Sequence, residues 1–268
     1  MTQQEPKPES PDYNQDSKQN LSSSEHMTSP SSNSVRRMFD SIAPYYVLLN
    51  HILSFGMDFS WRRKLAGSIN KEKKLQLLDL ATGTGDLLVS LLKRNNNITN
   101  AVGLDISENM LKLCRKELVK QKLYDRATLI LADAAHTGLF GESFDVVTMG
   151  FGIRNTHNVS KTLQEIHRLL KQDGTVLILE FSLPPNWIIR KLYLLYLRNF
   201  VPLLGRLLSR DKNAYRYLNI SIENFYSIED FSSLMQKAGF LNISATPLTF
   251  GIVCIYKAYK TSTRSSEN

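Results

Sequence analysis

The sequence predicts an α/β fold with a mostly parallel, seven-stranded sheet that ends in an antiparallel hairpin. Short runs of Leu, Ile and Val alternate with helical stretches between residues 75 and 180. Strands that are apolar on both faces are typical of a parallel sheet covered by helices on both sides. The last two strands, Phe240–Ala245 and Ile252–Tyr259, are separated only by Thr246–Gly251. That gap is too short for a crossover helix, so these two strands must pair antiparallel.

The other expected elements follow in regular order. Leu75–Leu80 is the first strand, a short apolar run just before a glycine-rich turn. The next elements are helix Leu87–Lys93, strand Ala101–Asp105, helix Ser107–Gln121, strands Thr128–Ala132 and Phe144–Met149, helix Val159–Leu170, strand Thr175–Glu180 and helix Ile228–Ala238. Ser107 is the expected N-cap of its helix. Gly174 and Gly239 are expected to end the helices that precede them.

Composition indicates a globular protein with a basic surface. The 268 residues include 33 Lys+Arg and 25 Asp+Glu, a formal charge of +8. Apolar residues make up 42% and charged residues 22%, which excludes a collagen-like, fully disordered or integral-membrane chain. A basic surface favours nucleic acid, acidic lipid headgroups or a phosphorylated substrate, unless it serves solubility alone. Cys114 and Cys254 are too few for a disulfide framework, and we expect both to be buried free thiols.

One folded domain is expected between two tails. Residues 1–34 are rich in Ser, Gln, Asn and Pro and nearly lack large apolar side chains, so we expect them to be disordered. The domain should run from 35 to 260, with an N-terminal lid and an insertion at 184–220, and 261–268 should be a second disordered tail. No signal-like apolar segment or run of 18 uncharged apolar residues occurs. We expect a cytoplasmic protein and leave membrane association open.

The glycine-rich turn predicts a nucleoside-binding loop. Leu78–Asp86 (LDLATGTGD) ends the first strand and opens a helix, which is where ligands bind in open α/β sheets. Gly83 and Gly85 permit the turn and let a ligand approach the backbone closely. A dinucleotide fingerprint needs a glycine where Leu88 stands, and Asp86 would repel a phosphate from the helix amides. The turn therefore favours S-adenosylmethionine, which has a cationic centre and no phosphate, over NAD.

Polar residues also follow the next two strands. Asp105 ends the second strand, and its carboxylate can accept two hydrogen bonds from ribose hydroxyls. Asp133 and Ala134 follow the third strand, where a carboxylate and a backbone amide could bind the edge of adenine. Either aspartate could instead only cap a following helix. Three such positions at one edge of the sheet predict a binding site for a nucleoside cofactor.

Six further segments are distinctive: residues 102–107 (VGLDIS), 144–155 (FDVVTMGFGIRN), 168–182 (RLLKQDGTVLILEFS), 46–54 through Trp61, 215–218 (YRYL) and 251–253 (GIV). Together they resemble the ubiquinone/menaquinone biosynthesis C-methyltransferases, a family of class I S-adenosylmethionine-dependent methyltransferases. The resemblance covers about residues 35–258. It implies a Rossmann-like fold and methyl transfer to a ring carbon of a polyprenylated quinol. That quinol would be demethylmenaquinol or a polyprenyl methoxy-benzoquinol.

The resemblance also implies a set of cofactor residues. These are Thr84, Asp105, Asp133 and Ala134, with Gly83, Gly85 and Gly150 beside them. The sequence departs from the family in the lid, where Val47 replaces a usual Asp and Asp58 replaces a usual His. Two other functions stay open: methylation of another phenolic or lipid acceptor, and nucleic-acid binding by a basic protein. The second is disfavoured because no nucleic-acid-binding motif occurs.

The implied reaction suggests three catalytic candidates. A quinol hydroxyl has a pKa of about 10, so catalysis must favour its ionised form. Arg154 could stabilise the developing oxyanion, Asn155 could orient the quinol, and Tyr46 could relay the proton or pack on the ring. A structural ion pair for Arg154 and simple lid packing for Tyr46 are the alternatives. A sulfonium carries its own leaving group, so no metal is expected, and the sequence indicates no clear general base.

The insertion has a composition of its own. Residues 187–212 mix aromatic, aliphatic and basic side chains with a single acid, Asp211. This mixture is typical of an interfacial helix on anionic lipid, although a lid helix packed on the sheet could have it too. The partners we expect are therefore a polyprenyl quinol and an anionic membrane surface, without nucleic acid. Homodimer formation stays open.

Overall fold

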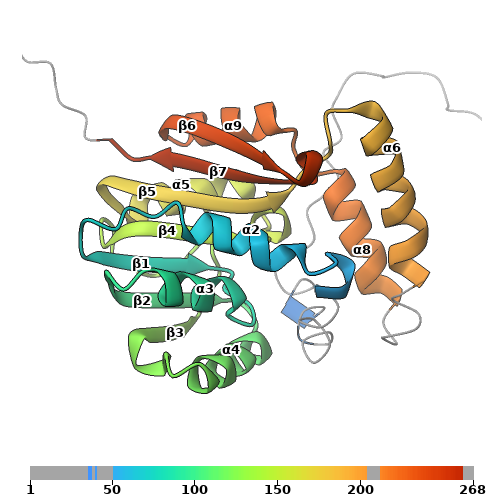
Figure 1. Cartoon of the computed structure of the whole chain (residues 1–268). Helices are drawn as coiled ribbons and strands as arrows, with labels where there is room; N and C mark the ends of the chain where they lie inside the picture. The colour runs from blue at the N-terminus through green and yellow to red at the C-terminus, as the bar shows by residue number, and fades with distance from the viewer. Residues whose placement is uncertain (1–35, 38–39, 41–50, 204–211, 262–268) are drawn as a thin grey trace, which may run out of the picture.

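The computed structural model describes residues 36–37, 40, 51–203 and 212–261. Its centre is a seven-stranded sheet in the order β3-β2-β1-β4-β5-β7-β6 (Figure 1). The strands are β1 (Leu75–Leu80), β2 (Ile98–Asp105), β3 (Ala127–Leu131), β4 (Phe144–Gly150), β5 (Leu170–Phe181), β6 (Leu241–Leu248) and β7 (Val253–Tyr259). Strands β1 to β5 pair in parallel, whereas β7 is antiparallel to both β5 and β6. The predicted fold class is confirmed.

Helices cover both faces of the sheet. They are α2 (Met57–Ala66), α3 (Asp86–Arg94), α4 (Glu108–Lys120), α5 (Val159–Leu169), α6 (Trp187–Leu195), α8 (Lys212–Glu223) and α9 (Ile228–Lys237). Helices α2, α3 and α4 pack on one face, and α5 and α9 pack on the other. Helix α6 continues as a π-helical turn, Tyr196–Phe200, and stands beside α8 at one end of the sheet (Figure 1).

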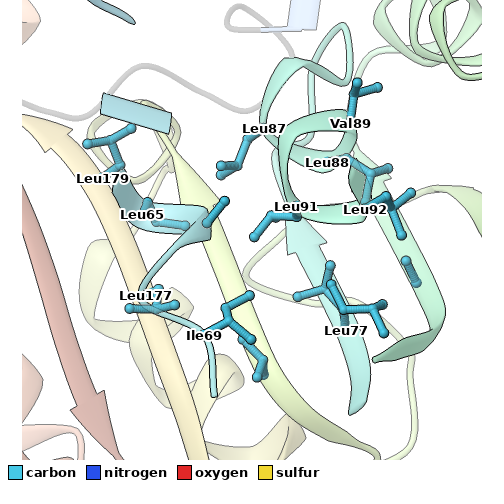
Figure 2. Packing of buried hydrophobic residues seen from close by; sticks show 14 of the residues in the cluster. Leu65, Ile69, Leu77, Leu87, Leu88, Val89, Leu91, Leu92, Leu177 and Leu179 are labelled. Carbon is cyan, nitrogen blue, oxygen red and sulfur yellow. The ribbon is translucent and has the colours of Figure 1, made fainter. Parts of the chain in front are cut away.

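Alternation along the strands divides the core into two layers. Leu77 of β1 packs under α2 and α3, while its neighbour Leu78 packs under α5 and α9. Figure 2 shows the first layer, which contains leucines of α3 together with Leu65 of α2 and Leu177 of β5. Each fully buried leucine contributes roughly 1.5–3 kcal/mol to the free energy of folding. This packing fixes the carboxyl ends of the strands, where the predicted site lies.

Most predicted local features are present. The hydroxyl of Ser107 accepts a hydrogen bond from the Met110 amide, so Ser107 is the N-cap of α4 as predicted. Gly239 follows α9 with a left-handed φ of 98°. Cys114 and Cys254 are buried free thiols. Among the helices that the structure describes, none is long and apolar enough to cross a membrane.

Three strand boundaries were predicted wrongly. Strand β2 begins at Ile98, not Ala101. Strand β5 begins at Leu170, not Thr175, because the chain passes from α5 directly into pairing with Phe144 of β4. Gly174 therefore lies inside the strand and does not end the helix. Strand β6 extends to Leu248 and includes Pro247, which is tolerated because β6 is an edge strand.

Some predictions lie outside the described residues. They are the disordered segment 1–34, most of 261–268, and the positions Tyr46 and Val47. The expected domain limits therefore stay predictions. The helix expected within residues 187–212 is present as α6 and its continuation through Leu203.

Candidate active site

A pocket lies at the carboxyl ends of β1, β2, β3 and β4. It encloses about 680 Å³ of empty space, part of which is open solvent. Its lining includes six of the predicted site residues: Gly83, Asp105, Asp133, Ala134, Gly150 and Asn155. We call the ends of β1 to β3 the cofactor side, and the ends of β4 and β5 with α8 the acceptor side.

The two glycines of the loop have different reasons to be glycine. Gly83 and Gly85 both have positive φ angles, of 56° and 88°. A Cβ atom on Gly83 would meet nothing closer than 4.0 Å, so this part of the backbone is open to a ligand. On Gly85 it would lie 2.6 Å from the sulfur of Cys114. Gly85 therefore lets α4 pack against the loop, whereas Gly83 presents its backbone to the pocket.

Asp105 connects the loop to the next strand. Its buried carboxylate accepts hydrogen bonds from the amides of Gly83 (2.8 Å) and Ser107 (2.9 Å). Burial raises the pKa of Asp105, and these amides act in the opposite direction. Each carboxylate oxygen accepts about two hydrogen bonds, so both can still bind a ribose hydroxyl. The helix cap is Ser107, so capping does not account for Asp105.

Asp133 and Ala134 form the adjacent wall. The Asp133 carboxylate accepts a hydrogen bond from the Ala135 amide at 2.8 Å. No helix follows directly after β3 in the described chain, which continues through a turn and a bridge to His136. The alternative of a helix cap therefore fails for Asp133. Thr84 does not line the pocket, and its buried hydroxyl donates to Asp86 at 3.2 Å.

Asp79 was not predicted as a site residue, but the structure shows that it has a structural role. Its carboxylate, 1% exposed, accepts hydrogen bonds from Thr82 at 2.7 Å and from Thr148 at 2.6 Å. Burial raises its pKa to about 6. The contacts tie the start of the loop to β4. An acid inside an apolar strand (LQLLDL) was the signal that could have identified it.

A second buried cluster fastens α2 to the loop. Arg62 forms an ion pair with Asp58 and lies 3.7 Å from Asp86, at the first turn of α3. Asp58 also contacts Nδ1 of His51 and accepts a hydrogen bond from Ser54, both at 2.7 Å. Burial alone would raise the pKa of Asp58, but the Ser54 hydrogen bond and the Arg62 charge hold it below its usual value. The residue that departs from the family pattern is therefore fully partnered.

Arg154 is held in a buried ion pair. Its Nη1 atom donates to Glu180 at 2.7 Å and to the carbonyl of Phe151 at 2.8 Å. Glu180, which is fully buried, also accepts a hydrogen bond from the Phe181 amide at 2.9 Å. The structural ion pair considered for Arg154 therefore exists. The sequence analysis missed Glu180, although it is the one acid in the apolar run TVLILEF.

The insertion supplies a further wall of the acceptor side. Tyr217 of α8 donates a hydrogen bond to the side-chain oxygen of Asn155 at 3.1 Å, and the Asn155 amide donates to Phe151 at 3.2 Å. Burial raises the pKa values of Tyr193 and Tyr217, the positive charge of Arg154 acts in the opposite direction, and the negative charge of Glu180 raises both further. Arg154 does not line the pocket itself, whereas Phe151, to whose carbonyl it donates, does.

Residues 27–260 match the model of the ubiE/COQ5 methyltransferase family. The chain belongs to this family. Demethylmenaquinone methyltransferase of Bacteroides fragilis is 37% identical over 85% of this chain and 93% of its own length. That of Thermotoga maritima is 40% identical over 82% and 93%. A ubiquinone/menaquinone biosynthesis C-methyltransferase of Geobacter sulfurreducens is 38% identical over 84% and 88%.

Solved structures support the fold of the family. A S-adenosylmethionine-dependent methyltransferase from Thermotoga maritima superposes with a TM-score of 0.59 at 18% identity, covering 85% of this chain and all of that one. The sheet order and the antiparallel β7 are shared by class I methyltransferases, so that expectation is confirmed. The family match makes this chain a methyltransferase. The open Gly83 backbone and the buried Asp105 carboxylate are compatible with the nucleoside of S-adenosylmethionine.

Proposed function

We propose that this ubiE/COQ5 methyltransferase transfers the methyl group of S-adenosylmethionine to a ring carbon of a polyprenylated quinol. The observation that carries the proposal is the family match over residues 27–260, together with relatives named for demethylmenaquinone and for ubiquinone/menaquinone biosynthesis. The acceptor is demethylmenaquinol or a polyprenyl methoxy-benzoquinol. Another phenolic or lipid acceptor would use the same cofactor side and differ only at the acceptor side.

The cofactor side supports binding of the methyl donor. We assign the ribose hydroxyls to Asp105 and the adenine edge to Asp133 and the Ala134 amide, with Gly83 and Gly150 in the pocket lining. Thr84 acts through the loop, because its hydroxyl is bound to Asp86. When bound, the donor supplies the methyl group on a cationic sulfur. The pocket needs no metal for this step.

The acceptor side would promote ionisation of the quinol. Loss of the hydroxyl proton to water pushes electron density onto the adjacent ring carbon. A bond then forms between that carbon and the methyl group as the methyl–sulfur bond breaks and its electron pair stays on sulfur. The ring proton finally passes to water, which restores aromaticity. Arg154 brings a fixed positive charge close to the phenols Tyr193 and Tyr217, which acts against the effect of burial on their pKa values, and a quinol hydroxyl is chemically similar. Glu180 fixes the guanidinium, and Asn155 is placed to hold the second quinol oxygen.

The location of the substrate suggests where the enzyme works. A polyprenyl chain keeps the quinol in lipid, so we propose that the enzyme acts in the cytoplasm at the surface of an anionic membrane. Tyr46 remains a candidate for proton relay. A homodimer also remains a prediction. Nucleic acid is not an expected partner.

The direct test uses purified protein and two short-chain quinols. Incubation with S-adenosylmethionine and demethylmenaquinol should yield a product heavier by one methyl group in mass spectrometry, alongside S-adenosylhomocysteine. A methoxy-benzoquinol tested in parallel identifies the preferred ring. If a purified chain that binds the donor in calorimetry methylated neither quinol, the proposal would be wrong and another phenolic or lipid acceptor would be favoured.

A further inference from the structure

One side of α6 and its continuation carries an apolar stripe that no described element covers. Its members are all exposed and recur at helical spacing: Trp187, Ile188, Leu192, Leu195 and Leu203. Leu192 is 61% exposed and Trp187 71%. In Figure 1 this helix stands at the outer end of the molecule, beyond α8. We call these five residues the α6 stripe.

The opposite side of the same helix packs against the rest of the protein. Tyr193, Leu197 and Val201 are buried against Ile222 of α8. A lid helix at the surface of a globular protein needs only one apolar face. The α6 stripe is a second apolar face on this helix, and a contiguous exposed apolar surface of this kind marks an interaction site.

The turn before α2 extends the stripe. Phe55 is 70% exposed and lines a groove with Leu192, Leu195 and other residues of the stripe region. Its ring lies 6.0 Å from that of Tyr196, whose hydroxyl donates to the Leu53 carbonyl at 2.7 Å. Phe55 has a positive φ of 51°, which is uncommon for a residue other than glycine. The turn therefore holds an exposed aromatic ring beside the stripe.

The charged residues of α6 and its continuation to Leu203 are all basic. Between Glu180 and Asp211 the sequence contains no acid. Arg190 and Lys191 on α6 are exposed, whereas Arg198 pairs with Glu223. An apolar stripe bordered by exposed cations is complementary to a bilayer with anionic headgroups.

We infer that the α6 stripe and Phe55 are the surface by which this protein docks on an anionic lipid bilayer. The helix lies in the plane of the headgroups, and its apolar side chains reach the acyl boundary. This inference rests on the proposed function, since a polyprenyl acceptor resides in lipid. Tyr193, on the buried side of the helix, packs in one cluster with Phe181, and the Arg154 guanidinium lies 5.2 Å from the centre of the Phe181 ring. Docking by the stripe therefore places the acceptor side of the pocket next to the bilayer.

The test compares two double variants of the full chain in vesicle flotation. Leu192→Glu with Leu195→Glu charges the stripe. Val119→Glu with Phe140→Glu charges equally exposed apolar positions elsewhere on the surface, 58% and 89% exposed. The wild type and the control variant should float with vesicles of phosphatidylglycerol and phosphatidylcholine at low salt. The floated fraction of the stripe variant should be at least about tenfold lower. Vesicles of phosphatidylcholine alone should bind the wild type weakly.

Tryptophan fluorescence gives an independent readout. The chain has two tryptophans, of which Trp61 is 4% exposed and Trp187 belongs to the stripe. Acidic vesicles should shift the emission of the wild type to shorter wavelength, and Trp187→Phe should remove that shift. Equal flotation of both double variants would overturn the inference. A dimer in sedimentation that the stripe variant loses, without vesicle binding by the wild type, would instead make the stripe an interface between two copies.

Methylation assays separate this inference from the proposed function. The stripe variant should methylate a short-chain quinol in detergent at the wild-type rate, but a vesicle-embedded long-chain quinol several-fold more slowly. If the wild type docked on vesicles and methylated no quinol in either form, the docking surface would stand and the proposed function would fail. Equal rates of the two proteins on the vesicle-embedded quinol would overturn the docking surface alone.

Discussion

On the cofactor side, the buried carboxylates accept hydrogen bonds from uncharged groups of the protein. Asp105 accepts from two backbone amides, and Asp79 accepts from two threonine hydroxyls. On the acceptor side, Arg154 and Glu180 pair with each other. A carboxylate held by amides keeps free lone pairs for a ligand, whereas a paired charge is already largely neutralised and acts mainly through its fixed position and its field. We therefore expect the cofactor side to bind its ligand through hydrogen bonds, and the acceptor side to orient and polarise the methyl acceptor.

The largest effect should come from removing Asp105. Asp105→Ala leaves the Gly83 amide without its acceptor and would remove the ribose contacts that we propose. Hydrogen bonds to a charged group contribute roughly 1.5–3 kcal/mol each, so affinity for S-adenosylmethionine should fall at least about 100-fold in calorimetry. Asp125→Asn, at an exposed position, is the control and should bind normally. Near-normal affinity in the Asp105 variant would show that the ribose is bound elsewhere.

The next effect tests the acceptor side. Arg154→Met leaves Glu180 buried without its cation, which should destabilise the protein by about 3–5 kcal/mol. Turnover should fall about 100-fold, as for loss of one oxyanion donor. The affinity for S-adenosylmethionine should stay within about twofold, because Arg154 is not on the cofactor side. Thermal unfolding, calorimetry and the quinol assay measure the three quantities.

A paired replacement separates folding from catalysis. Arg154→Met combined with Glu180→Leu removes both charges, and apolar replacement of a buried pair usually restores stability. We expect a stable protein that still turns over about 100-fold more slowly. Wild-type turnover in this double variant would assign the ion pair a structural role only.

These two sides also differ in how well the sequence predicted them. Gly83, Asp105 and Asp133 were found because each follows a strand, and the ends of parallel strands share one edge. The sheet itself was predictable from its apolar runs. Glu180 and Tyr217 were not identified, since their partners Arg154 and Asn155 lie far away in the sequence. Pairing of this kind depends on how β5 and α8 pack, which local patterns do not report.

A smaller effect concerns Asp79 and pH. Its folded-state pKa, about 6, lies above the ordinary value of 3.8, so the folded protein takes up a proton that the unfolded chain binds only at lower pH. The stability contributed by this group is therefore present below pH 3.8 and lost as pH rises through 6. Urea unfolding should show that the wild type gains up to about 3 kcal/mol relative to Asp79→Asn between pH 7 and pH 4. A constant difference between the two proteins across this range would contradict the raised pKa.

The smallest expected effect tests the link between the insertion and the acceptor side. Tyr217→Phe removes the hydrogen bond to Asn155 and keeps the ring. A neutral hydrogen bond contributes about 0.5–1.5 kcal/mol, so the KM for a short-chain quinol should rise about threefold to tenfold, with unchanged affinity for S-adenosylmethionine. Tyr226→Phe is a matched control, because Tyr226 packs on Phe225 and Phe231 away from the pocket. Asn155 accepts the hydrogen bond of Tyr217 and also lines the pocket, so it would transmit the loss of that bond to the acceptor. Equal KM values for the two phenylalanine variants would mean that α8 covers the pocket without positioning the quinol.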